Sequence, residues 1–470
     1  MLCSRTFFRR GEIIVTVTRK CAEYINSLKY EMIPNTVIDQ AKKLILDTIG
    51  CTLGGSQTEI ASIFLDYLLK GNKNPESTVI GHNLKISCQD SAFINAQMGH
   101  ILDYDETYKN IAHPAAPTLF PALSIGEIKQ KSGKDLLVAF IVGYDLAARI
   151  AAAMLPSGKR RERVWPFGTF HIFGAVGSAS KMLSLSTEQT IHALGIAGAT
   201  APVPSTRRYM EKQCMIKNCE GWVARAGLDA AYLAANGLTG LDNILDGDTG
   251  FWIMAGSDNC DYSLLQKNLG EEFEVINSSI KPYPSCKWAH STLEAFDQLK
   301  KQKNLQPDNI QKCICRSNSY VCDYMESDTY PETMEDAWTS IRWGIAMLCL
   351  GVPRGPAWFN KEYFNNNQVL DMMKRVELQP DPAVDKEFPE KLISTVEVIT
   401  VQGYKHISRV EIPKGDPERP LSWNDICQKF NEMASLIIGS NYSKTVINII
   451  QNLEEQTDLS ILTGFLKKLK

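Results

Sequence analysis

The chain has 470 residues, and its 50 basic residues against 53 acidic ones give a net charge of −3. This balance offers no basic excess for nucleic acid or for an anionic membrane, and we find no apolar run of membrane-spanning length. The length favours two or three domains, and 44% hydrophobic with 22% charged residues is ordinary for a soluble globular protein.

Thirteen cysteines are scattered along the chain without a C-x-x-C pair. This usage indicates a reducing compartment and buried thiols, and it argues against an iron–sulfur cluster. We therefore expect a cytoplasmic protein with no metal. The first ten residues, MLCSRTFFRR, contain three arginines and no acid, which is also compatible with mitochondrial targeting.

The chain up to about residue 260 has helical periodicity. Pro34 and the residues after it predict a helix start, and Gly54-Gly55 predicts its end. A short hairpin is expected over 76–90, followed by a helix over 91–102. Alanine- and glycine-rich helices are expected from 133 to 236, with small side chains that allow close packing.

The texture changes near residue 273. Two segments, QKCICRSNSYVCDY and LISTVEVITVQGYKHISRVEIP, alternate as half-buried strands do. Helical patterns occur between them and return after residue 422. The fold class that we predict is mainly α, with a large all-helical domain (1–272 and 414–470) and an inserted smaller α/β lid domain (273–413).

The stretch Gly99–Pro121 gathers acids around one histidine. Asp103 and Thr107 have i, i+4 spacing, so we expect them on one face of a helix that leads into a rigid loop. That loop presents His113, because Pro114 biases the preceding residue away from helical geometry. A histidine beside carboxylates can transfer protons. The alternative is a solvated helix end with a loop histidine.

Three other segments contain candidate anion ligands. Lys217 lies among small and apolar residues before a buried-looking helix, and the alternative for it is a surface loop lysine. Lys281 and His290 bound the segment KPYPSCKWAH, which is either an anion site or a rigid linker. Arg207 begins an Arg-Arg-Tyr sequence that could hold a carboxylate but also suits a solvated loop.

Several motifs are absent from the sequence. There is no G-x-G-x-x-G after a strand, no P-loop, no H-E-x-x-H and no G-x-S-x-G. Nucleotide-binding, metalloprotease and serine-hydrolase functions therefore have no support in the sequence.

In six ordered blocks the sequence resembles the MmgE/PrpD family, which includes 2-methylcitrate dehydratases, cis-aconitate decarboxylases and an iminodisuccinate epimerase. The blocks are HILDYDET…HPAAPTLFPAL, ALGIAGA, GWVARAGLDAAYLAANGLTG, KPYPSCKWAH, YPETMEDAWTSIRWGIAMLCLG and PKGDPERPLSW. The resemblance implies a helical domain built from both chain ends, an α/β lid, a homodimer and a cofactor-independent site between the domains. The active-site pattern of the family falls on Asp103, Thr107, His113, Lys217, Lys281 and, less securely, Tyr320 or Tyr324.

The sequence departs from the family pattern at one position. The decarboxylases and dehydratases usually carry a second histidine in a block before the alanine-rich helix, and Trp165 aligns there. His171 lies six residues later. Either a remodelled loop lets His171 take that place, or the chemistry does without the imidazole, and the indole of Trp165 then alters the substrate.

The leading hypothesis is a lyase that acts on a small di- or tricarboxylate by 2-methylcitrate-type dehydration or cis-aconitate-type decarboxylation. In it His113 is the acid/base and Asp103 orients it, while Lys217 and Lys281 bind carboxylates. Thr107 hydrogen-bonds the substrate and Tyr320 moves or positions a proton. The alternatives are an epimerase or isomerase that uses the same residues, and a non-catalytic relative that binds a carboxylate or a partner protein.

Overall fold

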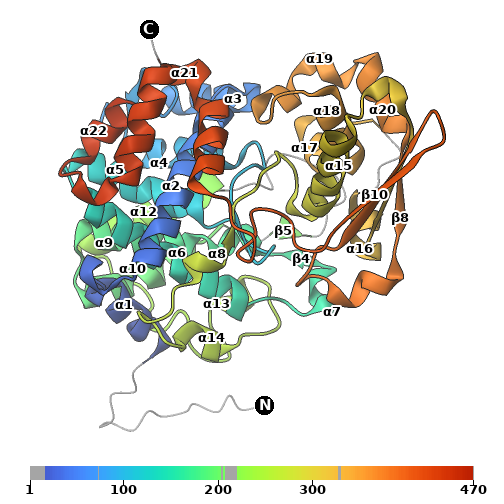
Figure 1. Cartoon of the computed structure of the whole chain (residues 1–470). Coiled ribbons are helices and arrows are strands. Elements are labelled where there is room, and N and C mark those ends of the chain that lie inside the picture. Colours follow the sequence, from blue (N-terminus) through green and yellow to red (C-terminus); the bar gives the residue numbers. More distant parts are fainter. Residues whose placement is uncertain (1–15, 72–73, 203–204, 207–219, 326–329, 469–470) are drawn as a thin grey trace.

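The computed structural model describes residues 16–71, 74–202, 205–206, 220–325 and 330–468. A helical body and a smaller α/β unit lie side by side (Figure 1). The predicted fold class, mainly α with a small inserted α/β region, is confirmed.

The body is built from helices of both chain ends. From the N-terminal part these are α1 (Val17–Ser27), α2 (Asn35–Gly55), α3 (Glu59–Leu69), α4 (Cys88–His100), α5 (Ala115–Ile128), α6 (Gly133–Ala153), α7 (Gly158–Arg161), α8 (Phe167–Phe170), α9 (Ile172–Leu183), α10 (Thr187–Thr200), α12 (Glu220–Ala235), α13 (Phe251–Met254) and α14 (Tyr262–Gln266). From the C-terminal part they are α21 (Trp423–Gln451), which breaks at Gly439, and α22 (Leu459–Gly464). Helix α21 packs along α2, so the chain end returns to the body.

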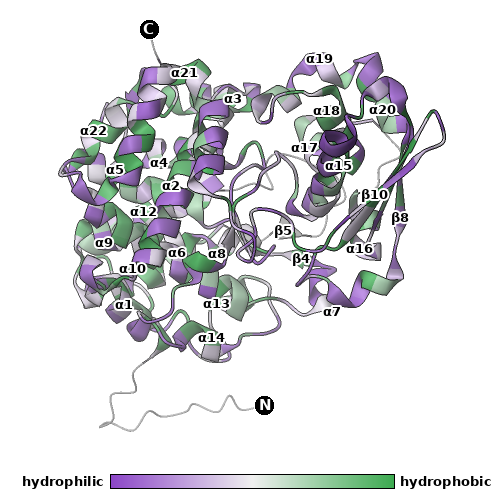
Figure 2. Cartoon of the chain, in the orientation of Figure 1, coloured by the Kyte–Doolittle hydropathy of each residue, from purple (hydrophilic) through white to green (hydrophobic). Residues whose placement is uncertain are grey.

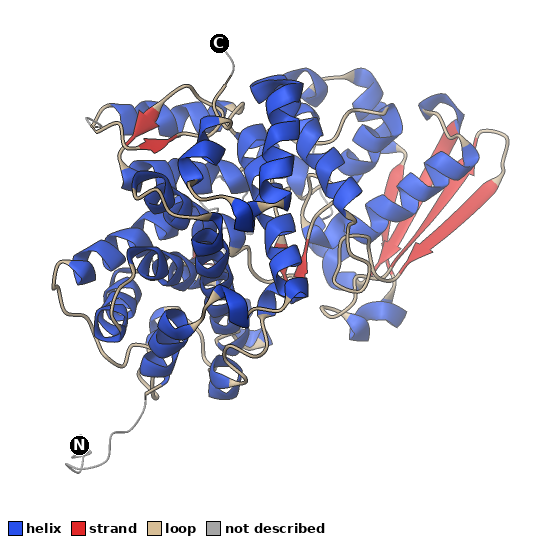
Figure 3. Cartoon of the chain, turned by 60° about the vertical axis from the view of Figure 1, so that its left-hand side comes forward, coloured by secondary structure: helices blue, strands red, loops and turns tan. Residues whose placement is uncertain are grey.

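The α/β unit contains one four-stranded sheet in the order β10-β9-β7-β8. Its strands are β7 (Ile310–Ser317), β8 (Val376–Pro380), β9 (Ser394–Thr400) and β10 (Lys405–Val410), and only the β7–β8 pair is parallel. Its helices are α15 (His290–Lys303), α16 (Ser319–Met325), α17 (Met334–Trp338), α18 (Ile341–Leu350), α19 (Lys361–Phe364) and α20 (Asn367–Lys374). Helix α15 packs on β9 and β10 and also on α18, and Figure 3 shows the sheet at the edge of the molecule.

Three two-stranded pairs are the other strands of the described residues. They are β1 (Ser77–Thr78) with β2 (Lys85–Ile86), β3 (Thr107–Tyr108) with β6 (Ser278–Ser279), and β4 (Val164–Trp165) with β5 (Ser205–Thr206), all antiparallel.

Each unit has its own hydrophobic core. The core of the body takes buried residues from 17–280 and again from 421–466, and the core of the lid takes them from 283–410. Apolar residues recur along both sets of elements in Figure 2. Trp165 packs against both cores. The domain boundaries at 272/273 and 413/414 stay predictions, and they lie close to these divisions.

Small residues let the central helices of the body approach each other. A Cβ atom at Gly143 of α6 would lie 2.5 Å from the carbonyl oxygen of Gly174 in α9, so a side chain there forces the helices apart. Helix α6 is the one described helix that is long and apolar enough to span a membrane, although the sequence analysis found no such run. It is a core helix, because 94% of its most apolar window is buried inside the protein.

Several predicted elements agree with the structure and one segment does not. The start and end of α2 and the hairpin β1–β2 are confirmed. The expected strand character after Ser317 is wrong. Asn318 accepts a hydrogen bond from the Val321 backbone at 2.9 Å, and this side chain begins α16 instead.

A buried ion pair joins α21 to α2 beneath the segment that follows α4. Lys429 Nζ lies 2.6 Å from an Asp47 carboxylate oxygen and also donates to the Tyr104 carbonyl at 2.7 Å. Burial raises the pKa of Asp47 to about 6, although Lys429 acts in the opposite direction. Removing both groups from water costs free energy, and each charge is stabilised only while its partner is present.

We expect Lys429→Met to lower the free energy of unfolding by about 3 kcal/mol, because it leaves the Asp47 carboxylate buried without a cation. Adding Asp47→Asn to this variant should restore part of the loss. Urea denaturation of the single and double variants measures both effects. The control is Lys374→Met, which removes an exposed pair with Asp371 and should cost less than about 1 kcal/mol. Equal losses in Lys429→Met and the control would contradict the prediction.

Candidate active site

The segment between α4 and α5 folds back on itself and gathers polar side chains. Asp103 has φ of 45°, which ends the helical path soon after His100. Strand β3 then pairs with β6, and the Thr107 hydroxyl donates to the Ala112 carbonyl at 3.2 Å. The prediction that a helix continues through Thr107 is therefore wrong. The left-handed residue and the pairing with a distant strand replace the helix by a tight loop.

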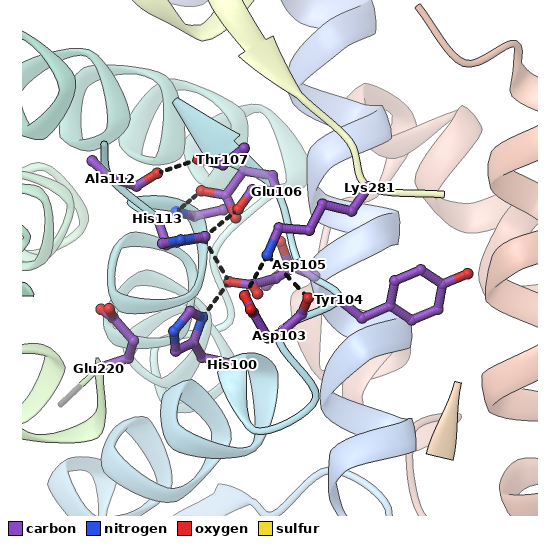
Figure 4. Close-up of polar contacts among 12 residues, drawn as sticks. His100, Asp103, Tyr104, Asp105, Glu106, Thr107, Ala112, His113, Glu220 and Lys281 are labelled. Carbon is purple, nitrogen blue, oxygen red and sulfur yellow. Dashed lines mark hydrogen bonds and ion pairs between the residues drawn. The ribbon is translucent and has the colours of Figure 1, made fainter. Parts of the chain in front are cut away.

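This loop brings two histidines onto one carboxylate (Figure 4). His100 Nδ1 lies 2.8 Å from an Asp105 carboxylate oxygen, and His113 Nδ1 lies 3.6 Å from the same oxygen. The two imidazole rings are 4.6 Å apart between centroids. Asp105 is fully buried, so its interactions with both rings are little screened.

The two histidines titrate in opposite directions. Burial opposes the charge on His100, but Asp105, together with Glu220 and Asp103, raises the pKa of His100 to about 9. Burial lowers the pKa of His113 to about 3, with Asp105 acting in the opposite direction. Burial would raise the pKa of Asp105, yet His100 holds it below its usual range. At neutral pH the cluster is thus a His100–Asp105 ion pair beside an uncharged His113.

The hydrogen bonds of His113 assign its tautomer. Its Nδ1 lies 2.6 Å from the Glu106 carbonyl oxygen, which can only accept, so Nδ1 carries the proton. Nε2 therefore carries a lone pair. About a quarter of this side chain stays exposed (24%), in contrast to the buried Asp105. His113 thus offers an available base at the edge of a buried cluster.

Glu106 accepts a hydrogen bond at the first residue of α5. One of its carboxyl oxygens accepts a hydrogen bond from the Ala115 backbone at 2.7 Å, and the other has no hydrogen-bond partner in the described structure. Burial, together with Asp105, raises the pKa of Glu106 well above its ordinary value. A neutral carboxyl group at this position avoids a second buried negative charge beside Asp105.

Lys281, two residues after β6, contacts the same cluster. Its ammonium group donates to the Asp103 carboxylate and, at 3.0 Å, to the Asp103 carbonyl. The side chain is completely buried. Burial disfavours its charge, but Asp103 and Asp105 raise the pKa of Lys281 above its ordinary value. A fixed cation therefore lies next to the histidines.

His171 lies behind His113 and is buried. The His113 backbone N–H donates to His171 Nε2 at 3.0 Å, and His171 Nδ1 donates to the Glu220 carboxylate at 2.8 Å. Both ring nitrogens are thus engaged with protein groups. In this structure His171 holds the backbone of His113. Of the two alternatives left open by the sequence, this arrangement favours the one in which His171 does not replace the second histidine, and the question stays a prediction.

The other predicted residues are distributed as follows. Thr107 is buried and its hydroxyl is directed to the loop. His290 is buried, donates from Nε2 to the Ser285 carbonyl at 3.1 Å, and burial lowers its pKa well below the ordinary value. Trp165 and Tyr320 meet around Trp288 in an aromatic group between the two units. Lys217 and Arg207 lie outside the described residues. The roles assigned to all of these residues stay predictions.

Sequence reasoning did not assign His100, Asp105 or Glu220 to the site. Asp105 stands in the acidic stretch, and His100 stands in the last turn of α4, directly before it. That proximity was a usable signal for His100. Glu220 lies more than a hundred residues away and becomes a partner of His171 only through the packing of α12 on α9.

One set of side chains in the described residues could hold a metal ion. Ligand atoms of His100, Asp103 and His113 lie within 4.8 Å of one another. The donor chemistry fits a cation poorly, since the Lys281 ammonium already binds the Asp103 carboxylate and would repel a metal. His100 would also have to lose the proton that Asp105 holds on it.

Comparisons with known proteins agree with the resemblance noted in the sequence. The model of the MmgE/PrpD N-terminal domain matches residues 19–261, and that of the MmgE/PrpD C-terminal domain matches residues 283–455. The human cis-aconitate decarboxylase is 28% identical over 97% of this chain and 95% of its own length. The mouse cis-aconitate decarboxylase is 27% identical over 97% and 94%. The cis-aconitate decarboxylase-like protein oryM of Aspergillus oryzae is 26% identical over 96% and 97%. Because the two domain models match in order over most of the sequence, the chain belongs to the MmgE/PrpD family.

Proposed function

We propose that the chain is a decarboxylase of cis-aconitate or of a closely similar small tricarboxylate. The enzyme class predicted from the sequence, a lyase of the MmgE/PrpD type, is confirmed by the full-length match to relatives named as decarboxylases. The choice of decarboxylation over dehydration rests on those names. The observation that supports proton transfer is the His113 imidazole, whose Nδ1 proton is held by the Glu106 carbonyl so that Nε2 keeps its lone pair, in a cluster where Lys281 binds Asp103.

The cluster contains two cations, Lys281 and His100, that a substrate carboxylate would share with Asp103 and Asp105. Lys281 and the protonated His100 supply positive charge in a setting where burial strengthens electrostatic interactions. A bound polycarboxylate adds negative charge next to His113 and raises its pKa, so His113 takes up a proton on Nε2. The free site thus keeps His113 uncharged, and the anionic ligand turns it into an acid.

In the proposed step, protonated His113 gives its Nε2 proton to the carbon at the far end of the carbon–carbon double bond. The bond to the carboxylate on the methylene carbon breaks, and its electron pair forms a new double bond. Carbon dioxide leaves, and His113 returns to its uncharged form. Lys281 stabilises the negative charge that shifts onto the neighbouring carboxylate. All electrons stay within the substrate, so the step needs no external oxidant or reductant.

Proton NMR of the purified protein with cis-aconitate in deuterated water tests the function. A new methylidene product with one deuterium on the adjacent methylene supports decarboxylation. Loss of water from 2-methylcitrate in the same assay would point to the dehydratase. Deuterium exchange into substrate without a product would favour the epimerase, and no change with any acid would favour a non-catalytic relative. We also propose that the protein is a homodimer, which light scattering measures. We further propose that it is cytoplasmic, which cell fractionation tests.

We expect His113→Ala to lower kcat by about 10²–10⁴-fold while the protein stays folded, because it removes the proposed proton donor. Initial rates and circular dichroism measure the two quantities. The control is His406→Ala in β10, which should keep the wild-type rate. Turnover of His113→Ala within tenfold of the wild type would remove the assignment.

We also expect kcat/KM to fall as the pH rises through about 9, because His100 then loses the charge that attracts the substrate. Asp105→Asn removes the charge that raises the pKa of His100. The alkaline limb of the pH profile should therefore move down, to about pH 6.5 or lower. Asp371→Asn, an exposed acid on α20, is the control and should leave the limb in place. An unchanged limb in Asp105→Asn would contradict the prediction.

A further inference from the structure

A pocket with an aromatic lining lies where the helical body meets the lid. Its volume is about 320 Å³, within the usual range for small-molecule sites. Apolar side chains from five separate segments line it: Ile111, Trp165, Trp288, Tyr320, Phe388 and Pro389. The elements α7, β4 and α16, which contribute lining residues, lie in this region in Figure 1.

The rings in this pocket form one packed group around Trp288. Its centroid lies 6.5 Å from that of Trp165, 5.4 Å from that of Tyr320 and 5.7 Å from that of Phe388, all with edge-to-face geometry. Two charged residues of opposite sign, Arg161 and Glu162, also line the pocket and leave it without net charge. The pocket therefore favours an apolar group rather than another carboxylate.

Two chain segments contribute to both the pocket and the catalytic cluster. In the first, Ile111 lines the pocket and His113 belongs to the cluster. In the second, Trp288 lines the pocket and Lys281 binds Asp103 in the cluster. Asn110, from the first segment, donates to the Pro389 carbonyl at 3.2 Å and ties the loop to the lid wall. The pocket and the cluster are thus neighbouring parts of one interdomain region.

We propose that this aromatic pocket binds an alkyl substituent of the substrate, so that the preferred substrates are alkyl-substituted tricarboxylates. The proposal rests on the proposed function for the identity of the charged end. In this arrangement Lys281 and the histidines hold the carboxylates, and a straight chain attached to the methylene carbon extends between Trp165 and Phe388. The unsubstituted acid leaves the pocket without an apolar occupant.

A homologous series tests the proposal. The probes are cis-aconitate and its derivatives with straight alkyl groups of one to six carbons on the methylene carbon. Burial of each methylene should raise kcat/KM by about threefold to fourfold until the pocket is filled. A flat or falling series would overturn the proposal and leave the decarboxylase function in place.

Binding without turnover separates this proposal from the proposed function. Propane-1,2,3-tricarboxylate with the same alkyl groups keeps the charges and the chain but has no double bond through which to decarboxylate. Its dissociation constant, measured by calorimetry, should fall by the same factor per methylene. If no acid is turned over but this dependence appears, the proposed function fails and the pocket proposal stands. If the dissociation constant does not depend on chain length, the pocket proposal fails whatever the activity.

Variants of pocket residues test whether the gain in affinity per methylene arises in this pocket. Trp165→Ala and Phe388→Ala should each reduce the gain per methylene to less than twofold in calorimetry. Phe388→Leu keeps an apolar side chain and should retain most of the gain, which guards against a general loss of structure. Tyr404→Ala removes an exposed aromatic ring outside the pocket and should leave the gain unchanged. Equal gains in all four variants would overturn the proposal.

Discussion

The buried contact between Lys281 and Asp103 is the interaction on which the candidate site depends. It joins the loop after α4 to the segment that follows β6, just before the chain enters the lid. A fully buried ammonium group is costly to desolvate, and the carboxylate with the carbonyl oxygen of Asp103 offsets that cost. Asp103 has a left-handed backbone, and both its carbonyl and its carboxylate oxygen accept from Lys281. The same residue therefore ends the helical path and fixes the cation.

A single carboxylate gives the two neighbouring histidines different charges. Asp105 lies 2.8 Å from His100 and 3.6 Å from His113, and only the nearer ring gains enough to overcome burial. The result at neutral pH is one charged imidazole, His100, beside one uncharged imidazole, His113. Neither property belongs to histidine by itself, since both follow from distance and burial.

The parts of the fold that local chemistry determines could be predicted from the sequence. Pro34 and Gly54-Gly55 set the ends of α2, and Pro114 holds His113 in a loop. The strand conformation of Thr107 could not be predicted, because β3 forms only through pairing with β6, far along the chain. In the local sequence the i, i+4 pattern of Asp103 and Thr107 favours a helix instead. The proximity of Lys281 to Asp103 followed from the family resemblance rather than from spacing. Glu220 could not be predicted, because its contact with His171 exists only after α12 packs on α9.

Trp165 and His171 lie close together in the sequence but make different contacts in the structure. The sequence left open whether His171 compensates for the indole at position 165. In the structure His171 spends one nitrogen on the His113 backbone and the other on Glu220, so it stabilises the base instead of facing a ligand. Trp165 meanwhile packs against the cores of both units. Because Trp165 contacts both domains and lines the aromatic pocket, its size affects both how the lid packs on the body and the shape of the pocket. In the proposed pocket, substrate preference and domain packing both depend on this side chain.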